Sequence, residues 1–439
     1  MTRNLFGTDG IRGRFGQEPF TYQSLVSLGQ AIGSWFIERY GANQPLLIAR
    51  DTRESGSFIT STLLSGILSY PVNVRDAGII PTPVAHWLAT QGYARCAIII
   101  SASHNPYQDN GIKIIDAVSG KLTHDDEATL STRALQPRQM GYEQPGTLSY
   151  FVTGQQEYHN YLLKSFGNFI VPGKKIIFDC AHGATTEIAQ KIANESQGTI
   201  VCINNTPNGK NINNNAGAVH PSSLIKAVID NHADMGCAFD GDGDRLIVVS
   251  REGTIKDGDD ILALLSRDKR YESVNTLVST VMSNFGFNQW LCKHNKRLEQ
   301  VSVGDKHIIK KMNEDNLPLG GEPSGHIIIR DHLSSGDGLY TALLLIKTLK
   351  EGANNEELVT FTRLPSRILN MQVQVKKSLD DPQLQEALST AQQIVASGRI
   401  FARYSGTEPL LRVLIEDISA DQLDQAYNYL HNRLTELLS

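Results

Sequence analysis

Short apolar runs alternate with amphipathic stretches along most of the chain, and this order predicts the strands and helices of an α/β fold. In the first part of the chain, the predicted strands are 46–49, 72–75, 96–100 and 111–115, and the predicted helices are 58–68 and 83–89. A second part follows the turn at 172–173, with strands at 175–178, 199–203 and 235–239 and helices at 187–195 and 223–231. The third part has predicted strands at 276–281 and 300–303, and helices at 259–265, 288–293, 306–313 and 338–349.

These three parts have the character of distant structural repeats, because each holds an apolar run that ends in a polar, glycine-bearing loop and then resumes. The loops are centred on Ser103, Asp240 and Glu322. The end of the chain differs, with alternating strands predicted at 368–375, 399–403 and 410–415 and helices at 382–395 and 419–438. We therefore predict three similar α/β domains with mixed sheets, at 1–152, 153–252 and 253–363, and a C-terminal α+β domain at 364–439.

Composition narrows the class of protein. The 439 residues carry a net charge of −5, which gives no electrostatic basis for binding nucleic acid. The apolar runs are too short to span a bilayer, and the N-terminus lacks the apolar core of a secretory signal. The five cysteines form no Cys-x-x-Cys pair, which is typical of buried thiols in a reducing compartment. We expect a cytoplasmic protein with no membrane or nucleic-acid partner, and a homodimer is compatible with the sequence.

Three aspartates stand at alternate positions in Phe239-Asp-Gly-Asp-Gly-Asp-Arg245, directly after an apolar run. Alternate side chains of an extended segment point the same way, so Asp240, Asp242 and Asp244 converge and repel one another unless a divalent cation compensates them. An EF-hand is excluded because its sixth and twelfth positions hold arginine here instead of glycine and glutamate. A solvated acidic turn is the structural alternative. The segment predicts a site for a hard divalent cation.

A second candidate loop is Ser101-Ala-Ser-His-Asn-Pro106, which follows another apolar run. Ser103 offers a hydroxyl nucleophile, and His104 beside it is a candidate acid, base or hydrogen-bond donor. Lys113 supplies a point charge suited to phosphate, and Arg12 is a candidate for the same site. A plain turn or cap is the alternative for Ser103. A serine that carries phosphate beside a cation site would form a phosphoryl-transfer centre.

Two later loops have the composition of ligand-binding segments. Residues 320–326, Gly-Gly-Glu-Pro-Ser-Gly-His, place Glu322 and Ser324 two positions apart, a pair suited to vicinal sugar hydroxyls. Residues 403–409, Arg-Tyr-Ser-Gly-Thr-Glu-Pro, with Arg412 beyond them, combine hydroxyls, a glycine turn and guanidinium groups, as a phosphate cradle does. A glycine turn and a charged hairpin loop are the respective alternatives. The chain has neither a Walker motif nor GxGxxG, so nucleotide binding is not supported.

Taken together and in this order, these segments resemble the α-D-phosphohexomutase superfamily over essentially the whole chain. The resemblance implies four domains around a central cleft, each contributing one loop. Within the superfamily the chain is most similar to the glucosamine branch. That similarity is carried by Phe6-Gly-Thr-Asp-Gly-Ile-Arg-Gly13, Asn110-Gly-Ile-Lys113, the aspartate segment and Ser335-Gly-Asp-Gly-Leu339.

The resemblance also implies a role for each matching residue. Ser103 would carry the phosphoryl group, and its phosphate would join Asp240, Asp242 and Asp244 in holding one Mg²⁺. Arg12, His104 and Lys113 would handle protons and charge. The implied substrate-binding residues are Glu322, Ser324 and His326 for the sugar, and Arg403, Ser405, Gly406, Thr407 and Arg412 for the phosphate that is not transferred.

The implied activity is isomerisation of glucosamine 6-phosphate to glucosamine 1-phosphate, through a phosphoserine and a 1,6-bisphosphate, as a step towards amino-sugar nucleotides and cell-envelope precursors. The chain departs from that branch at Pro323, at Tyr404 and at residues 217–220, and it has Lys306 where the superfamily's Gly-Asp-Arg segment has arginine. Because Pro323 lies in the sugar loop, a phosphomannomutase/phosphoglucomutase acting on neutral hexoses remains the alternative.

Two other classes of protein are weaker hypotheses. A non-catalytic sugar-phosphate sensor would not need an intact Ser103 and three aspartates. A haloacid-dehalogenase-type phosphatase needs an aspartate nucleophile in Asp-x-Asp-x-Thr/Val, whereas Asp244 fills the fifth position of that motif here.

Overall fold

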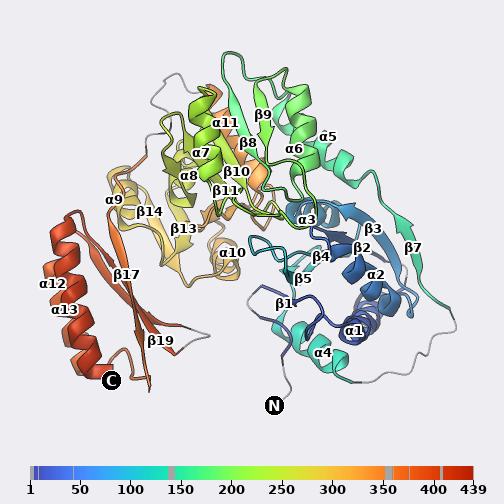
Figure 1. Ribbon diagram of the computed structural model, residues 1–439, viewed down its shortest axis with the longest axis horizontal. Coiled ribbons are helices and arrows are strands. Elements are labelled where there is room, and N and C mark those ends of the chain that lie inside the picture. Colours follow the sequence, from blue (N-terminus) through green and yellow to red (C-terminus); the bar gives the residue numbers. More distant parts are fainter. Residues whose placement is uncertain are drawn as a thin grey trace. The chain divides into compact units, whose positions relative to one another are not determined.

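The computed structural model describes residues 4–7, 9–42, 44–136, 144–351, 358, 360–374, 376–405 and 409–438. The chain forms two compact units, a larger one of Met1–Val281 with Glu299–Val359 and a smaller one of Met282–Leu298 with Thr360–Ser439. Figure 1 shows the order of the elements along the chain. None of the helices within the described residues is long and apolar enough to cross a membrane.

The first sheet of the larger unit has seven strands, in the order β1-β5-β4-β2-β3-β7 with β6 paired to β5. The strands β2, β3, β4 and β7 run parallel, and β5 is antiparallel to both β4 and β1. The strand bounds are β1 Ile11–Arg14, β2 Pro45–Arg50, β3 Asn73–Ile79, β4 Cys96–Ile100, β5 Asp109–Asp116, β6 Gly120–Lys121 and β7 Thr147–Tyr150.

The helices that accompany this sheet in the described part of the chain are α1 Tyr22–Tyr40, α2 Gly56–Ile67, α3 Thr82–Thr90 and α4 His124–Ala134. One face of β2 and β4, with Leu46, Ile48 and Ile98, joins α1, α2 and α4 in a single buried apolar cluster. The helices α1 and α2 approach closely because Gly29 faces the Leu63 carbonyl, where a Cβ would lie 2.2 Å from the oxygen. This core holds β2 and β4 in place, and so positions the loops that follow their carboxyl ends.

The second and third sheets repeat the plan. The second has the order β12-β11-β10-β8-β9 and the third β14-β13-β15-β16. The strand bounds are β8 Ile176–Asp179, β9 Ile200–Ile203, β10 Met235–Phe239, β11 Leu246–Ser250, β12 Ile255–Lys256, β13 Thr276–Thr280, β14 Arg297–Val301, β15 Leu319–Gly321 and β16 Ile327–Ile329. The helix bounds are α5 Gly154–Phe166, α6 Thr186–Glu195, α7 Ser222–Asp230, α8 Gly258–Leu265, α10 Asp305–Glu314 and α11 Gly338–Glu351.

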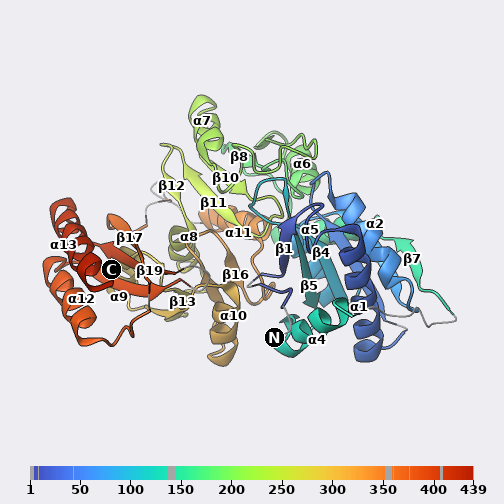
Figure 2. The same cartoon turned by 60° about the horizontal axis from the view of Figure 1, so that its bottom comes forward.

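The smaller unit is the predicted α+β module. Its antiparallel sheet has the order β17-β19-β18, formed by Ser366–Gln372, Leu410–Glu416 and Arg399–Tyr404. The helices α12 Pro382–Ile394 and α13 Ala420–Leu438 lie side by side and contact this sheet (Figure 2). Helix α9, Phe285–Lys293, belongs to the same unit.

The four candidate loops share one structural setting: each joins two antiparallel neighbouring strands. The Ser103 loop joins β4 to β5, the aspartate segment joins β10 to β11, the Glu322 loop joins β15 to β16, and the arginine loop joins β18 to β19. In the first three sheets the strand before the loop also pairs with a parallel neighbour. The repeated apolar–loop–apolar pattern of the sequence therefore corresponds to a repeated hairpin, and the predicted α/β fold with a C-terminal α+β unit is confirmed.

Candidate active site

Ser103 lies in the hairpin loop after β4, buried to 3 % exposure. Its hydroxyl donates a hydrogen bond to Asp240 Oδ2 at 2.6 Å, although the two residues are 137 positions apart. The Nδ1 atom of His104 lies 3.3 Å from the same hydroxyl oxygen. The structure thus brings together the two loops that the sequence singled out for phosphoryl transfer.

The aspartate segment turns between β10 and β11, so its three carboxylates are all buried. One oxygen from each of Asp240, Asp242 and Asp244 lies within 4.8 Å of the other two. The Oδ1 atoms of Asp242 and Asp244 have no hydrogen-bond partner among the described residues. Three buried, converging carboxylates, two of which keep an oxygen without a donor, are the ligands expected for a hard divalent cation, so the site fits one.

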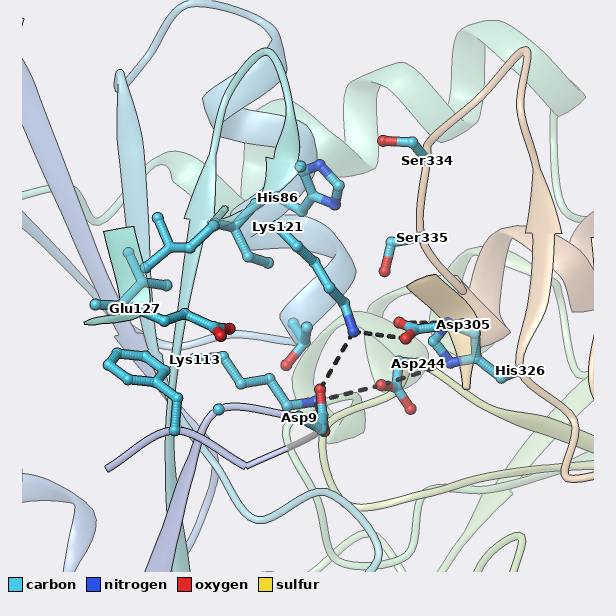
Figure 3. Close-up of a pocket in the computed structure, with 17 residues that line it drawn as sticks. Asp9, His86, Lys113, Lys121, Glu127, Asp244, Asp305, His326, Ser334 and Ser335 are labelled. Carbon is cyan, nitrogen blue, oxygen red and sulfur yellow. Dashed lines mark hydrogen bonds and ion pairs between the residues drawn. The ribbon is translucent and has the colours of Figure 1, made fainter. Parts of the chain in front are cut away.

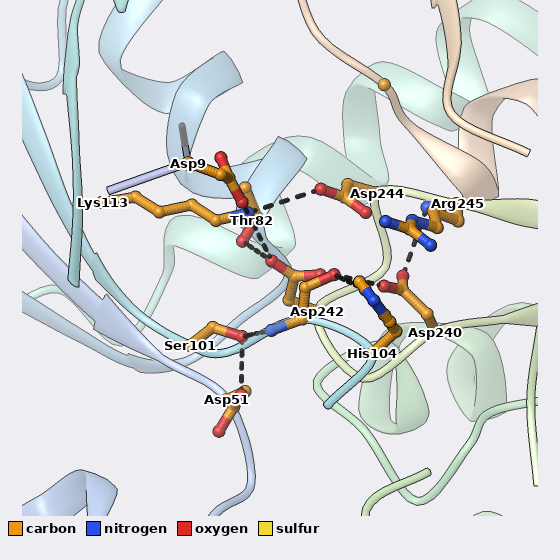
Figure 4. A network of polar contacts seen from close by, with 12 residues as sticks. Asp9, Asp51, Thr82, Ser101, His104, Lys113, Asp240, Asp242, Asp244 and Arg245 are labelled. Atoms are coloured by element: carbon orange, nitrogen blue, oxygen red, sulfur yellow. Dashed lines mark hydrogen bonds and ion pairs between the residues drawn. The ribbon is translucent and has the colours of Figure 1, made fainter. Parts of the chain in front are cut away.

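Thr82 and Lys113 hold the middle aspartate from the first sheet (Figure 4). The Thr82 hydroxyl donates to Asp242 Oδ2 at 2.6 Å, and the Thr82 N–H donates to the Asp242 carbonyl at 2.9 Å. The Lys113 ammonium lies 3.3 Å from the same Oδ2 atom and 3.6 Å from Asp244 Oδ2. Lys113 sits in β5 and Thr82 begins α3, directly after β3, so the part of the chain that forms the first sheet supplies both donors to the aspartate segment that follows β10.

The charges of this cluster shift its pKa values in opposite directions. Burial and the neighbouring carboxylates raise the pKa of Asp240 well above its usual range. Burial also raises the pKa of Asp244, but Lys113 and His326 outweigh it, so that pKa falls well below the usual value. Burial lowers the pKa of Lys113, yet Asp242, Asp9 and Asp244 raise it overall, and Lys113 remains a cation. Burial lowers the pKa of His104 to about 4, which leaves its imidazole neutral at pH 7.

Arg12 lies on β1, and its guanidinium donates hydrogen bonds to Asp9 and to the Ser101 carbonyl. Its guanidinium donates to the Ser101 carbonyl at 3.2 Å and pairs with Asp9 Oδ2 at 2.5 Å. Asp9 in turn lies 3.2 Å from the Lys113 ammonium. Arg12 is therefore linked to the aspartate cluster through Asp9, a residue to which the sequence analysis gave no role.

A cavity of about 60 Å³ adjoins this cluster in the larger unit (Figure 3). Lys121 reaches across it to Asp305 Oδ1 at 2.5 Å and lies 3.6 Å from Asp9 Oδ1. His326 also lines it, with Nε2 accepting the Gly336 N–H at 3.0 Å and Nδ1 3.7 Å from Asp244 Oδ2. His326 thus belongs to the predicted sugar loop and also lies close to the aspartate segment.

Glu322 and Ser324 occupy the turn between β15 and β16. The Ser324 hydroxyl donates to Glu322 Oε2 at 3.1 Å, and the Gly304 N–H donates to Glu322 Oε1 at 3.0 Å. Gly325 has a φ of +91°, and a Cβ there would lie 2.2 Å from the Leu246 carbonyl oxygen, so the turn packs directly on β11. The predicted sugar pair is therefore held against the strand that follows the aspartate segment.

Arg403 and Arg412 lie in the smaller unit, directly opposite each other on β18 and β19. Both line a cavity of about 450 Å³ together with Asn370 of β17. Ser405 is buried, and its N–H donates to the Leu410 carbonyl at 2.8 Å. The other two residues of the predicted cradle, Gly406 and Thr407, fall outside the described residues. Two guanidinium groups facing one cavity provide the donors that an anion requires.

Several residues of the cluster were not predicted from the sequence. Asp9 lies in the motif 6–13 and Arg245 ends the motif 239–245, so membership of these motifs could have marked both residues as candidates. Arg245 donates its N–H to Asp240 Oδ1 at 3.2 Å. Thr82 and Lys121 had no such signal, since each acts through a contact made by the fold with a residue more than 100 positions away.

Comparisons with known proteins agree with this arrangement. Models of the four phosphoglucomutase/phosphomannomutase domains match residues 3–139 (alpha/beta/alpha domain I), 156–253 (domain II), 257–363 (domain III) and 371–427 (C-terminal domain). A phosphoglucosamine mutase of Marinomonas is 37 % identical, over 100 % of this chain and 99 % of its own. One of Thermus thermophilus is 38 % identical, over 94 % of each chain.

Solved structures share the fold. A phosphoglucomutase/phosphomannomutase family protein of Burkholderia thailandensis has a TM-score of 0.80 at 23 % identity, covering 99 % of this chain and 97 % of that one. An N-acetylphosphoglucosamine mutase of Aspergillus fumigatus, solved with GlcNAc-6P and magnesium, has a TM-score of 0.68 at 19 % identity, covering 99 % and 96 %. With curated relatives this similar over nearly its full length, the chain belongs to the phosphoglucosamine mutases of the phosphoglucomutase/phosphomannomutase family.

Proposed function

We propose that this chain, a phosphohexomutase, interconverts glucosamine 6-phosphate and glucosamine 1-phosphate by passing a phosphoryl group through Ser103. The observation that carries the proposal is the Ser103 hydroxyl, 2.6 Å from Asp240 Oδ2 at the edge of three buried carboxylates. The choice of glucosamine as the sugar is supported by relatives that bear the name phosphoglucosamine mutase at 37–38 % identity.

The proposed cation is one Mg²⁺, held by Asp240, Asp242 and Asp244 together with a phosphate oxygen on Ser103. Its proposed contribution is charge: a phosphoserine carries nearly two negative charges near pH 7, and a divalent ion offsets them as the phosphoryl group leaves. Magnesium in the Aspergillus fumigatus relative supports this identity.

In the proposed reaction, the phosphorus on Ser103 forms a bond to O1 of glucosamine 6-phosphate, and its bond to Ser103 Oγ breaks. The proton that O1 loses is balanced by the proton that Ser103 Oγ gains, so the transfer consumes no net proton, and the neutral imidazole of His104, with Nδ1 3.3 Å from Ser103 Oγ, is our candidate to relay it. The 1,6-bisphosphate then turns over and returns its O6 phosphoryl group to Ser103. Lys113 and Arg12 contribute fixed positive charge beside the transferred group.

The remaining predicted residues bind the parts of the substrate that do not react. We assign the sugar hydroxyls to Glu322, Ser324 and His326. The phosphate that stays in place is assigned to Arg403, Ser405, Gly406, Thr407 and Arg412. Both orientations of the bisphosphate must be bound, which the pseudo-symmetric equatorial hydroxyls of the sugar permit. The cytoplasmic location and the domain boundaries at 152, 252 and 363 stay predictions.

Replacing the nucleophile tests the proposal. Ser103→Ala should lower kcat by about 10³-fold or more, because the phosphoryl carrier is gone. The control is Ser61→Ala, an exposed serine of α2 whose hydroxyl only donates to the Phe58 carbonyl. Intact-mass analysis should show one phosphate on the Ser61→Ala protein and none on Ser103→Ala. A Ser103→Ala enzyme with wild-type kcat would end the proposal.

Substrate profiling decides the sugar. We expect kcat/KM to be highest for glucosamine phosphate among the glucosamine, glucose and mannose phosphates. The alternative is a phosphomannomutase/phosphoglucomutase, and a higher kcat/KM on glucose or mannose phosphate would favour it. Pro323, beside Glu322 in the sugar loop, is the residue to which such a preference would be traced first.

A further inference from the structure

The backbone of Ser103 has a conformation that side-chain-bearing residues rarely adopt. Its φ is +52°, in the left-handed region, which is strained for a residue with a Cβ and persists only where surrounding contacts impose it. The contacts that impose it here come from two different parts of the larger unit.

Arg53, three residues after the end of β2, hydrogen-bonds to the Ser103 loop. Its side chain is 1 % exposed and follows β2. Its Nη2 donates to the carbonyls of Ser103 and Asn105, both at 2.9 Å, and its Nη1 donates to the Pro106 carbonyl. Its Nε pairs with Asp51 Oδ2 at 2.8 Å. One guanidinium therefore fixes three carbonyls of the loop and is itself fixed by a buried carboxylate.

The same carboxylate reaches the loop by a second route. Asp51 Oδ2 accepts the Ser101 hydroxyl at 2.6 Å, and the Ser101 oxygen accepts the Ser103 N–H at 2.9 Å. The N–H and the carbonyl of Ser103 are both tied to Asp51, one through Ser101 and the other through Arg53. Rotation of Ser103 out of its left-handed conformation would break both connections.

Asn213 lies between β9 and α7 and hydrogen-bonds to the Ser103 loop. It is 5 % exposed, and its Nδ2 donates to the Ser103 carbonyl at 2.9 Å and to the Asn105 carbonyl at 3.1 Å. Its own N–H donates to the Ala181 carbonyl, just after β8. Gly241, between two of the aspartates, packs on this junction: a Cβ there would lie 2.7 Å from both Asn213 Nδ2 and the Ser103 carbonyl oxygen.

We infer that Arg53 and Asn213 are positioning residues for phosphoryl transfer, acting together as a clamp on the Ser103 loop. Each of the Ser103 and Asn105 carbonyls receives one donor from Arg53 and one from Asn213, so both lone pairs of each oxygen are used. The clamp sets Ser103 Oγ against Asp240 and joins the nucleophile loop to the body that carries the aspartates. The inference rests on the proposed function of Ser103.

The expected effect is on the chemical step rather than on substrate binding, since a displacement of about 1 Å at a reacting atom can cost roughly 100-fold in rate. Asn213→Asp is nearly isosteric and replaces the donating amide with an oxygen that faces two carbonyls. We expect kcat to fall 10- to 100-fold while KM for glucosamine 6-phosphate stays within about twofold. Asn214→Asp, at the exposed neighbouring position, makes the same charge change and should keep wild-type kcat.

A measurement without turnover distinguishes the clamp from a general loss of stability. Hydrogen exchange of the amides at 102–105 should be at least tenfold faster in Asn213→Asp and unchanged in Asn214→Asp, with the amides of α1 as the internal reference. Arg53→Lys is the second variant, because it keeps a cation beside Asp51 but loses the planar fork. We expect Arg53→Lys to show the same fall in kcat and the same faster exchange at 102–105. This variant therefore tests the clamp even where Asn213→Asp does not fold.

The outcomes separate this inference from the proposal beneath it. Wild-type kcat in Asn213→Asp, or exchange that rises equally over α1 and the loop, overturns the clamp while Ser103→Ala remains inactive. Full activity in Ser103→Ala overturns the proposed function itself. A selective fall in kcat with fast exchange confined to the loop supports the clamp.

Discussion

The hydroxyl of Thr82 offers a test of how α3 orients the aspartates of the candidate cation site. Thr82 is 3 % exposed at the start of α3, and its hydroxyl donates to Asp242 Oδ2 at 2.6 Å. Thr82→Val removes that donor and keeps the shape of the side chain. After the change, the Lys113 ammonium at 3.3 Å is the remaining donor to that oxygen among the described residues, while Asp242 Oδ1 already has none.

The size of the effect follows from the charge of the acceptor. A hydrogen bond to a buried charged group contributes about 1.5–3 kcal/mol. With an unfolding entropy of about 2.1 cal/mol/K per residue, a cooperative larger unit of roughly 340 residues should lose about 2–4 °C in Tm. Hydrogen bonds to a metal ligand also orient it, and their loss usually weakens metal binding 10- to 100-fold. We expect that range for the Kd of Mg²⁺.

Thermal unfolding and titration calorimetry with Mg²⁺ measure the two effects separately. The control is Thr90→Val, at the other end of α3, where the exposed hydroxyl donates to the Trp87 carbonyl. That variant should change stability by no more than about 0.5 kcal/mol and leave Mg²⁺ binding as it is. Should Thr82→Val match Thr90→Val in both Tm and Kd, Asp242 does not depend on this donor and the reasoning is refuted.

Two further predictions concern packing and charge. Gly241→Ala should lower kcat at least tenfold, because the new Cβ meets the Ser103 carbonyl oxygen at 2.7 Å; steady-state kinetics at wild-type rate would contradict it. Asp268 accepts hydrogen bonds from Arg270 and Thr348, and Arg270 holds its pKa well below the usual range. Its contribution to stability is therefore present above about pH 4 and lost as the pH falls, so the Tm difference between wild type and Asp268→Asn should shrink from pH 7 to pH 3; a constant difference would refute it.

The fold could be predicted because its strands are continuous apolar runs. The runs at 96–100 and 235–239 are fully buried strands bounded by polar, glycine-bearing loops, and no helical period competes with them. Helix α1 was not predicted, although Leu25, Leu28, Ile32 and Phe36 are buried along one side of it. Ala31, Gly33 and Ser34 are buried as well, because α2 packs closely against α1. The helix therefore lacks the regular alternation of apolar and polar faces by which an amphipathic helix is predicted.

The site could be predicted only as far as its motifs reached. Ser103 and the aspartates stand out since their residue types repeat at short spacing. Arg53 and Asn213 are single polar residues whose importance comes from contacts with carbonyl groups, and a carbonyl leaves no mark in the sequence. His326 was predicted for the sugar through its motif, but its contact with Asp244 depends on how the third sheet is placed against the second.

The site residues Asp51, Arg53 and Thr82, which no motif predicted, nevertheless share one topological position. In the first sheet, β4, β2 and β3 are parallel neighbours, so their carboxyl ends meet at one edge, where α/β folds usually place their ligands. Ser103 follows β4, Asp51 and Arg53 follow β2, and Thr82 follows β3, each within three residues of the strand's end. The aspartates follow β10 in the second sheet in the same way, and Gly183, after β8, packs on Gly241. The residues just after β2, β3, β4 and β10 therefore meet around the Ser103 loop and the aspartate segment, whether or not they belong to a motif.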